Sequence, residues 1–123
     1  MSIKPNKLLP SQEAQMIKLW YVYIMSNRRN GVLYIGSTDN LGERVKEHKL
    51  KRFPNAFTAR YNCDKLIYIE EYTNGVGASI REKRMKKWKR EWKIKLINEI
   101  NPSWMDISMN WKPDMTRFRT LQK

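Results

Sequence analysis

Two short segments rich in aromatic and β-branched residues, separated by a turn, impose the strongest constraint on how this chain can fold. Residues 20–25, WYVYIM, and residues 32–36, VLYIG, both have the composition of β-strands. Between them lies SNRRNG, residues 26–31, which ends in Asn30-Gly31, a dipeptide typical of hairpin turns. The sequence therefore predicts a β-hairpin over residues 20–36.

A helix and a third strand are expected after the hairpin. Asp39 or Asn40 can cap a helix over about residues 41–50, because their side chains accept hydrogen bonds from the first free backbone N–H groups. Residues 51–64 predict a loop. Residues 65–72, KLIYIEEY, have the composition of a third strand.

A helical pattern dominates the chain from Ala78 to about Ile100. Its apolar residues recur at spacings of three and four and form one stripe, which contains Met85, Trp88, Trp92 and Leu96. A helix of this length could break between Trp88 and Trp92, and Asn101-Pro102 ends it. The order β-β-α-β-α-α predicts a small α/β domain in which helices flank a three-stranded antiparallel sheet.

The length and the polar ends of the chain predict one domain. A chain of 123 residues can bury a single hydrophobic core. We expect an N-terminal extension over residues 1–19, the folded domain over residues 20–108 and a polar C-terminal tail over residues 109–123.

The charge balance predicts a polyanionic partner. Lys and Arg number 25 and Asp and Glu 12, which gives a formal net charge of +13. Such an excess favours a nucleic acid or an acidic membrane surface. No apolar run has the length of a membrane span, and the first residues lack the apolar core of a signal peptide. A single cysteine, Cys63, excludes a disulfide framework, so we expect a cytoplasmic protein whose partner is nucleic acid rather than membrane.

The hairpin brings two tyrosines into one place. If Met25 faces Val32, then Tyr23 lies directly across from Tyr34, with Cβ atoms roughly 5 Å apart. Both hydroxyls would then emerge on the same face of the sheet. The alternative is that both rings pack as ordinary strand residues, since aromatic residues favour strands in any case.

The first expected helix adds two polar side chains. Arg44 and His48 are four residues apart and share a helix face with the apolar residues Leu41 and Val45. They should therefore lie at the margin of the packed surface and look towards the hairpin. The alternative is a solvated charge pattern with an incidental histidine.

A carboxylate within a strongly basic segment is the third unusual feature. Residues 80–95 carry nine basic residues and only two acidic ones, Glu82 and Glu91. On a helical wheel Glu82 lies at the edge of the apolar stripe. It could pair with Arg81 or Lys86, or it could be a hard oxygen ligand for Mg²⁺.

Several other basic residues could contact the phosphates of a nucleic acid without reading its sequence. For each of them singly, a solvated side chain is the alternative. The candidates on the hairpin turn and on the long helix are Arg28, Arg29, Arg84, Lys86, Lys87, Lys89 and Arg90.

These residues together resemble the GIY-YIG nuclease family. Tyr21-Val22-Tyr23 and Tyr34-Ile35-Gly36 are similar to its two signature strands, although the first motif begins with Tyr and Val where the family has Gly and Ile. The stretch STDNLGERVKEH resembles the family's first helix. The stretch ASIREKRMKKWKREWKIKLINEINPSW resembles the second half of its short, single-domain bacterial branch. The similarity covers roughly residues 20–108.

The resemblance implies roles for individual residues. Tyr23 and Tyr34 match the two motif tyrosines, Arg44 the catalytic arginine and His48 the accessory histidine. Glu82 matches the metal-binding glutamate. The family also uses an asparagine late in the domain, which is matched here by Asn101 or Asn98.

The resemblance also implies an activity: a DNA endonuclease that hydrolyses phosphodiester bonds with Mg²⁺ or Mn²⁺. Tyr23 is then favoured as the general base, with Tyr34 orienting water or phosphate, and we expect the five matched side chains to converge on one basic, concave patch. Whether the DNA is branched or single-stranded stays open, as do any protein partners. The alternative is a non-catalytic nucleic-acid-binding module on the same fold.

Overall fold

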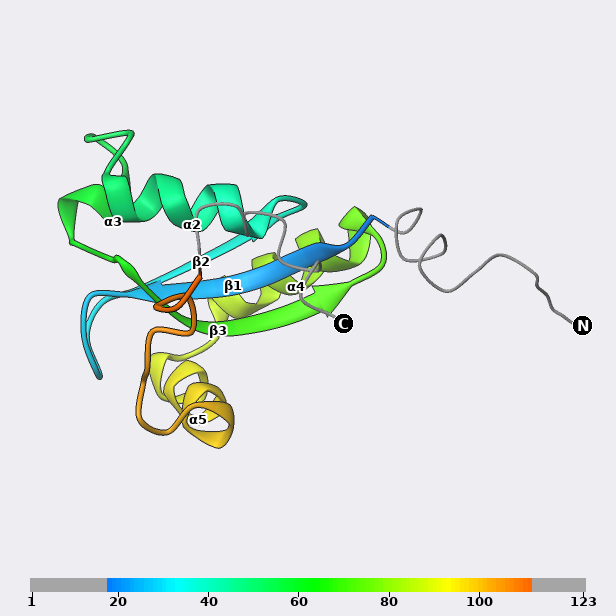
Figure 1. Ribbon diagram of the computed structural model, residues 1–123. Helices are drawn as coiled ribbons and strands as arrows, with labels where there is room; N and C mark the ends of the chain where they lie inside the picture. Colours follow the sequence, from blue (N-terminus) through cyan, green and yellow to red (C-terminus); the bar gives the residue numbers. More distant parts are fainter. Residues whose placement is uncertain (1–17, 112–123) are drawn as a thin grey trace, which may run out of the picture.

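A computed structural model describes residues 18–111 of the chain as a three-stranded antiparallel sheet with helices on both faces (Figure 1). The fold class and the order of strands and helices predicted from the sequence are confirmed, with one additional short helix. Nearly all of the expected N-terminal extension, and all but the first three residues of the expected tail, lie outside the described residues. Within the described part of the chain, no helix is long and apolar enough to cross a membrane.

The predicted hairpin forms the centre and one edge of the sheet. Strands β1 (Trp20–Ser26), β2 (Leu33–Thr38) and β3 (Lys65–Tyr72) are arranged in the order β2-β1-β3. The central strand β1 is buried along almost its whole length, because it is covered on both faces and paired on both sides. Strand β2 is therefore an edge strand with one unpaired side.

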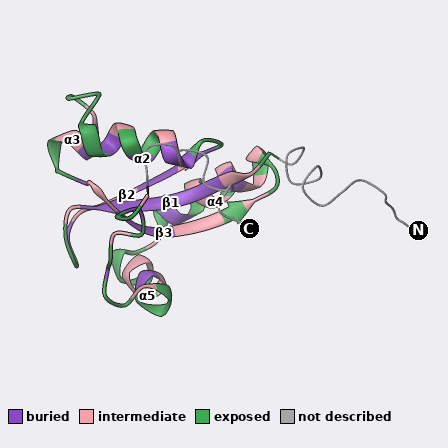
Figure 2. Cartoon of the chain, in the orientation of Figure 1, coloured by how far each residue is buried: buried purple, intermediate pink, exposed green. Residues whose placement is uncertain are grey.

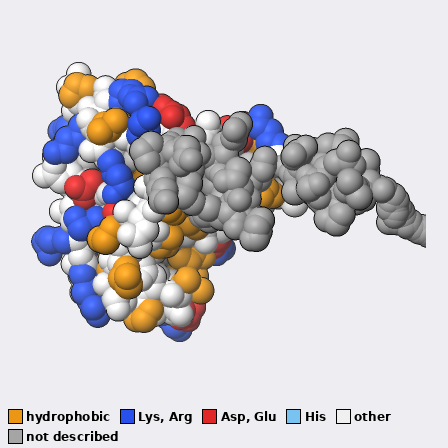
Figure 3. Space-filling view, viewed as in Figure 1, with side chains coloured by type: hydrophobic (Ala, Val, Ile, Leu, Met, Phe, Trp, Pro, Cys, Tyr) orange, Lys and Arg blue, Asp and Glu red, His pale blue; other side chains and the backbone are white. Residues whose placement is uncertain are grey.

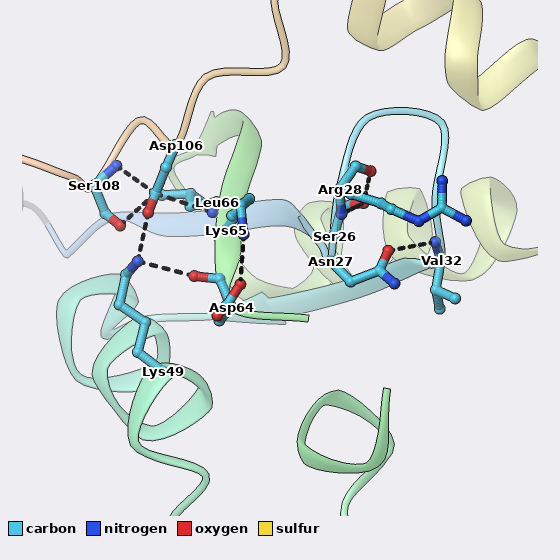
Figure 4. Close-up of polar contacts among 10 residues, drawn as sticks. All are labelled: Ser26, Asn27, Arg28, Val32, Lys49, Asp64, Lys65, Leu66, Asp106 and Ser108. Carbon is cyan, nitrogen blue, oxygen red and sulfur yellow. Dashed lines mark hydrogen bonds and ion pairs between the residues drawn. The ribbon is translucent and has the colours of Figure 1, made fainter. Parts of the chain in front are cut away.

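The register of the hairpin differs from the predicted one by two residues. Tyr23 pairs with Gly36 and Met25 pairs with Tyr34, so the two tyrosines lie diagonally rather than directly opposite. The turn explains the difference, because Asn27 Oδ1 accepts a hydrogen bond from the backbone N–H of Val32 at 2.8 Å and keeps Val32 out of the ladder (Figure 4). A shift of two residues leaves every side chain on its expected face.

Helices α2 (Leu41–Leu50) and α3 (Phe57–Arg60) lie along one face of the sheet. Asn40 is the cap of α2, since its side chain accepts from the backbone N–H of Glu43. Helix α3 lies within the segment that was expected to be a loop. Its four residues are too few to produce a periodic apolar pattern, which is why the sequence gives no signal for it.

Helices α4 (Gly75–Lys87) and α5 (Arg90–Ile100) replace the single long helix, and the break falls between them at residues 88–89. Helix α4 begins three residues before the expected start, because Asn74 caps it by accepting from the backbone N–H of Gly77 at 2.7 Å. Figure 1 shows α4 on the far side of the sheet from α2, with α5 beyond β3.

The alternation of β1 separates two hydrophobic cores, and Figure 2 shows the buried residues gathered along the strands and the inner sides of the helices. Tyr21, Tyr23 and Met25 face the core under α2. Val22 and Ile24 face the core under α4 and α5. The same alternation on β2 places Tyr34 and Gly36 towards α2 and places Ile35 and Ser37 towards α4.

Candidate active site at the edge strand

Three of the predicted residues form a cluster of rings on the α2 face. The ring centroids of Tyr23 and Tyr34 are 6.2 Å apart, and that of His48 lies 5.3 Å from Tyr34 and 5.8 Å from Tyr23. Strands β1 and β2 supply the tyrosines, and the last turn of α2 supplies the histidine. The pairing of β1 with β2 and the packing of α2 on the sheet therefore bring these three side chains into contact.

Gly36 explains how Tyr23 reaches His48. A Cβ atom at Gly36 would lie 2.6 Å from the Tyr23 hydroxyl oxygen and 2.7 Å from Cζ, closer than real Cβ contacts occur. The Tyr23 ring thus lies flat across the backbone of Gly36, its partner in the ladder. Gly36 is required because only a residue without a side chain leaves room for the Tyr23 ring. It is not required for an unusual backbone angle, since no glycine among the described residues has a positive φ.

The hydroxyl of Tyr23 belongs to a buried hydrogen-bonded chain. It lies 3.0 Å from His48 Nε2, and His48 Nδ1 lies 2.8 Å from Thr58 Oγ1. Burial, together with the positive charge of Arg44, lowers the pKa of His48 to about 4, so the imidazole is neutral at pH 7. A neutral imidazole donates from one nitrogen and accepts at the other, so each of its two bonds has a definite direction.

Thr58 is a site residue that the sequence did not indicate. It is buried and comes from the short helix α3. A lone threonine in a segment without periodicity carries no functional signal, and only the contact with His48 identifies it.

The two tyrosines differ in their access to solvent. Tyr23 is completely buried, and burial raises the pKa of its hydroxyl, with a further rise from Tyr34 that the charge of Arg44 only partly offsets. Tyr34 is partly exposed. These features argue against the expected choice of Tyr23 as the base that meets a water molecule, and they favour Tyr34.

Arg44 lies beside this cluster with a half-exposed side chain. Its charge acts on the pKa values of both Tyr23 and His48. Its Nε is 3.6 Å from Glu47 Oε1, and the Glu47 side chain is mostly buried. The guanidinium also interacts with the hydroxyl of Tyr23, and its solvent-exposed side can contact an anion.

Glu82 lies on α4 and is held by two donors. Its carboxylate accepts a hydrogen bond from Ser37 Oγ, and its Oε2 lies 2.6 Å from Lys86 Nζ. Burial works to raise the pKa of Glu82, but the hydrogen bonds from Lys86 and Ser37 and the charges of Lys86 and Lys83 lower it overall. The carboxylate is therefore ionised at neutral pH, and it is partly open to solvent.

The expectation that all five side chains share one patch is wrong for Glu82. Glu82 accepts a hydrogen bond from Ser37 on the α4 face of the sheet, whereas Tyr34 and His48 lie on the α2 face. The reason is that α4 crosses to the opposite side of the sheet from α2. The two groups approach each other only around the unpaired side of β2.

A hollow of about 230 Å³ spans this free edge. Side chains from both faces line it, so Tyr34 and Lys86, the ion-pair partner of Glu82, border the same space. The lining residues are Leu33, Tyr34, Ile35, Phe57, Lys86 and Lys93. The edge of β2 is thus the place where the two halves of the predicted site can act on one ligand.

The donor set at this edge fits a hydrated divalent cation. Among residues 18–111 no three His, Cys, Asp or Glu side chains come together, so Glu82 is the carboxylate available here. The Ser37 hydroxyl lies beside it. A single carboxylate with water completing the shell is typical of Mg²⁺ sites that also bind phosphate.

Asn101 does not take part in this site. Its Nδ2 donates to the carbonyls of Ile67 at 3.0 Å and Met105 at 2.9 Å, and its Oδ1 accepts from the Met105 N–H. It ends α5 beside β3, the edge opposite to β2. The alternative, Asn98, accepts a hydrogen bond from Trp104 Nε1 at 2.7 Å. These contacts speak against the assignment of Asn101 as a catalytic residue and give its amide a role in the fold.

All of the predicted phosphate-binding residues are exposed, and Figure 3 shows Lys and Arg side chains spread over one face with few acidic ones between them. These residues are Arg28, Arg29, Arg84, Lys86, Lys87, Lys89 and Arg90. Arg90 also has a structural contact: its Nη2 donates to the carbonyls of Asn30 at 2.7 Å and Gly31 at 2.6 Å, which ties α5 to the hairpin turn.

Comparisons with known proteins give one family match and several similar proteins. The family model described as the GIY-YIG catalytic domain matches residues 19–95, a range that contains both tyrosines, Arg44, His48 and Glu82. The UPF0213 protein of Syntrophus aciditrophicus (strain SB) is 33% identical over 85 residues, which cover 69% of this chain and 95% of that protein. The UPF0213 protein CPE1444 of Clostridium perfringens (strain 13 / Type A) is 37% identical over 82 residues, 63% of this chain and 82% of that protein.

A viral protein and a solved structure are also similar. The UPF0213 protein in the VLF1-GP41 intergenic region of Autographa californica nuclear polyhedrosis virus is 32% identical over 82 residues, 65% of this chain and 77% of that protein. The solution NMR structure of the UPF0213 protein BH0048 from Bacillus halodurans aligns with a TM-score of 0.46 and 20% identity, covering 75% of this chain and 97% of that one.

Proposed function

The chain belongs to the GIY-YIG family, whose catalytic-domain model matches residues 19–95, and on this basis we propose that it is a metal-dependent DNA endonuclease that hydrolyses phosphodiester bonds. The observation that carries the proposal is the cluster of Tyr23, Tyr34 and His48 beside Arg44, next to the edge strand to which Glu82 is hydrogen-bonded. A binding module needs neither a buried tyrosine–histidine pair nor a carboxylate among cations.

The first task of the site is to hold a phosphate. The net charge of +13 attracts a polyanion, and the half-exposed Arg44 presents a planar fork of N–H donors that matches phosphate oxygens. Negative charge on the phosphate grows in the transition state, so a guanidinium placed here stabilises it more than the ground state. Lys86 and Lys93, at the other side of the hollow, neutralise the flanking phosphates.

The second task is to activate a water molecule. Tyr34 is the tyrosine with solvent access and borders the hollow, so its hydroxyl is the group that takes a proton from water or orients it. The positively charged guanidinium of Arg44 lies close enough to interact electrostatically with both tyrosines.

His48 acts as a positioning residue. It bonds the Tyr23 hydroxyl on one side and Thr58 on the other, and its ring meets Tyr34 edge-on. This arrangement holds the Tyr34 ring in one orientation on the face of the sheet, which limits the entropy lost when substrate binds.

Glu82 and the Ser37 hydroxyl would hold Mg²⁺ or Mn²⁺ on the other side of the edge strand. When bound, such a cation stabilises charge on the phosphate and on the leaving oxygen. Lys86 is largely exposed and can leave Glu82 to pair with a phosphate instead.

One observation favours the second candidate, a non-catalytic nucleic-acid-binding module. Glu82 lies across the sheet from the tyrosines and has an ordinary i, i+4 ion pair with Lys86. In that case the carboxylate serves only stability, and the protein binds DNA through its exposed cations.

Nicking of supercoiled plasmid, with Mg²⁺ and with chelator, separates the two. We expect wild type to nick only with the metal, and Glu82→Gln to lose cleavage by orders of magnitude while DNA binding stays equal or tightens. Glu91→Gln is the matched control, since Glu91 is exposed in the same basic segment and should leave cleavage unchanged. A wild-type protein that cuts neither plasmid, branched DNA nor single strands with Mg²⁺ would refute the nuclease and leave the binding module.

A further inference from the structure

A row of aromatic rings runs from the tyrosine cluster out to the surface along α3. The Tyr34 ring centroid lies 6.1 Å from that of Phe57, with an angle of 33° between the ring planes. The Phe57 centroid lies 4.7 Å from that of Tyr61, at 43°. Because Tyr34 also contacts His48, the row continues the candidate active site without a gap.

The outer two rings of the row, Phe57 and Tyr61, are exposed. Phe57 keeps 44% and Tyr61 keeps 45% of their surface open to solvent. Between them, Thr58 is buried and bonded to His48, which anchors α3 to the site. The rings are therefore held at a set position relative to Tyr34, and a cluster of exposed aromatic residues of this kind indicates a binding surface.

The surroundings of the rings are cationic. The Arg60 guanidinium lies 5.8 Å from the Tyr61 ring centroid. Lys86 and Lys93 line the hollow that Phe57 shares with Tyr34. Exposed aromatic rings among Lys and Arg are the composition of sites for single-stranded nucleic acid, in which bases stack on the rings and phosphates contact the cations.

We propose that Phe57 and Tyr61 form a stacking platform for an unpaired base of the DNA strand whose phosphate lies at Tyr34. The inference rests on the proposed nuclease function and defines its substrate class: DNA with at least one unpaired nucleotide beside the cleaved bond. A base inside a duplex already stacks on its neighbours and offers only its edges, so it cannot occupy this surface. The adjacent cations favour a polyanion over an apolar protein surface.

Binding measured in chelator, where nothing is cleaved, tests the platform separately from the nuclease. Fluorescence anisotropy compares a labelled single strand of about 20 nucleotides with its duplex at one salt concentration. We expect Phe57→Ala and Tyr61→Ala each to weaken single-strand binding about 5- to 100-fold and to leave duplex binding nearly unchanged. Phe57→Tyr keeps a ring and should bind like wild type.

Phe53→Ala is the matched control, because Phe53 is more exposed than these rings, at 58%, and has no ring contact among the described residues. It should bind both substrates like wild type. A single strand that carries abasic sites at its central positions should bind wild type as weakly as Phe57→Ala binds the intact strand. Phe57→Ala should not distinguish intact from abasic strands. Thermal unfolding confirms that each variant is folded.

Two results would overturn the platform. The first is that Phe57→Ala and Tyr61→Ala bind single strands as tightly as wild type, which would mean that the rings do not bind DNA bases. The second is that affinity for duplex and for single strand falls equally, which would mean that the rings serve the fold. Either result combined with Mg²⁺-dependent nicking refutes the platform but keeps the nuclease. Ring-dependent single-strand binding without any cleavage refutes the nuclease but keeps the platform.

Discussion

Alanine at Gly36 would place a methyl group against the ring of Tyr23. A Cβ atom there lies 2.6 Å from the Tyr23 hydroxyl oxygen, about 0.8 Å inside the 3.4 Å at which ordinary Cβ contacts begin. Tyr23 is fully buried and bonded to His48, so its ring cannot move aside without breaking that bond. Overpacking of a buried site typically costs about 1–3 kcal/mol of unfolding free energy.

Thermal unfolding followed by circular dichroism measures this cost. For a domain of this size each kcal/mol shifts Tm by about 4–8 °C, so Gly36→Ala should melt roughly 4–24 °C below wild type. Plasmid nicking should fall as well, because the displaced Tyr23 ring no longer holds His48. Gly77→Ala is the matched control and should melt close to wild type. The nearest atom to its added Cβ is Asn74 Oδ1, at 3.3 Å, and alanine has a higher helix propensity than glycine at this position in α4.

The same substitution made in the Tyr23→Phe variant tests whether the clash is with the Tyr23 ring. Tyr23→Phe removes the nearest clashing atom, so Gly36→Ala should cost less in that background than in wild type, although Cζ and Cε1 of the ring stay close. Gly36→Ala with the Tm of wild type, or with a cost that simply adds to that of Tyr23→Phe, would show that the ring does not cross the glycine.

Three further predictions concern other side chains. The pKa of His48 falls from 6.5 in the unfolded chain to about 4 in the folded one, so the unfolded state binds the proton first. The free energy of unfolding should therefore decrease as pH falls from about 6.5 towards 4, more steeply in wild type than in His48→Gln; equal slopes in urea titrations would contradict this. Asn101→Ala leaves two backbone carbonyls and one N–H without their partner and should lower stability by about 1–3 kcal/mol while kcat per folded molecule stays unchanged; a kcat lost without a loss of stability would restore its catalytic role. Tyr34→Phe should abolish nicking with DNA affinity unchanged, whereas Arg44→Ala should lose both, as measured by plasmid nicking and anisotropy; full nicking by either variant would remove that residue from the site.

The hairpin shows how far local sequence determines structure. Asn30-Gly31 between two β-branched and aromatic segments predicted both strands and the turn, and Asn30 indeed adopts a left-handed φ of 57°. The register was predicted wrongly by two residues, because it depends on the bond from Asn27 to Val32 inside the turn. The face of each tyrosine was nevertheless right, since it depends only on the alternation of the strand.

The helices show the same division. The spacing of Arg44 and His48 placed both at the margin of the packed side of α2, where His48 is buried and Arg44 is half-exposed. The apolar stripe with its possible break predicted α4 and α5. Thr58 had no signal, because a single turn of helix has no periodicity. Asn101 matched a family position by its place in the chain, yet its amide is used up by backbone groups that come from β3 and from the segment after α5.

The sequence by itself determined what short-range forces decide: which segments form strands and helices, which side chains share a face of one element, and that the surface is strongly cationic. Only the tertiary structure decided which face of the sheet each helix covers. Glu82 was placed correctly at the edge of the stripe on α4, but its position across the sheet from Tyr34 depends on how the chain crosses after β3. That crossing is chosen by the burial of both faces of β1 at once, a packing requirement that joins residues far apart in the chain and leaves no local pattern.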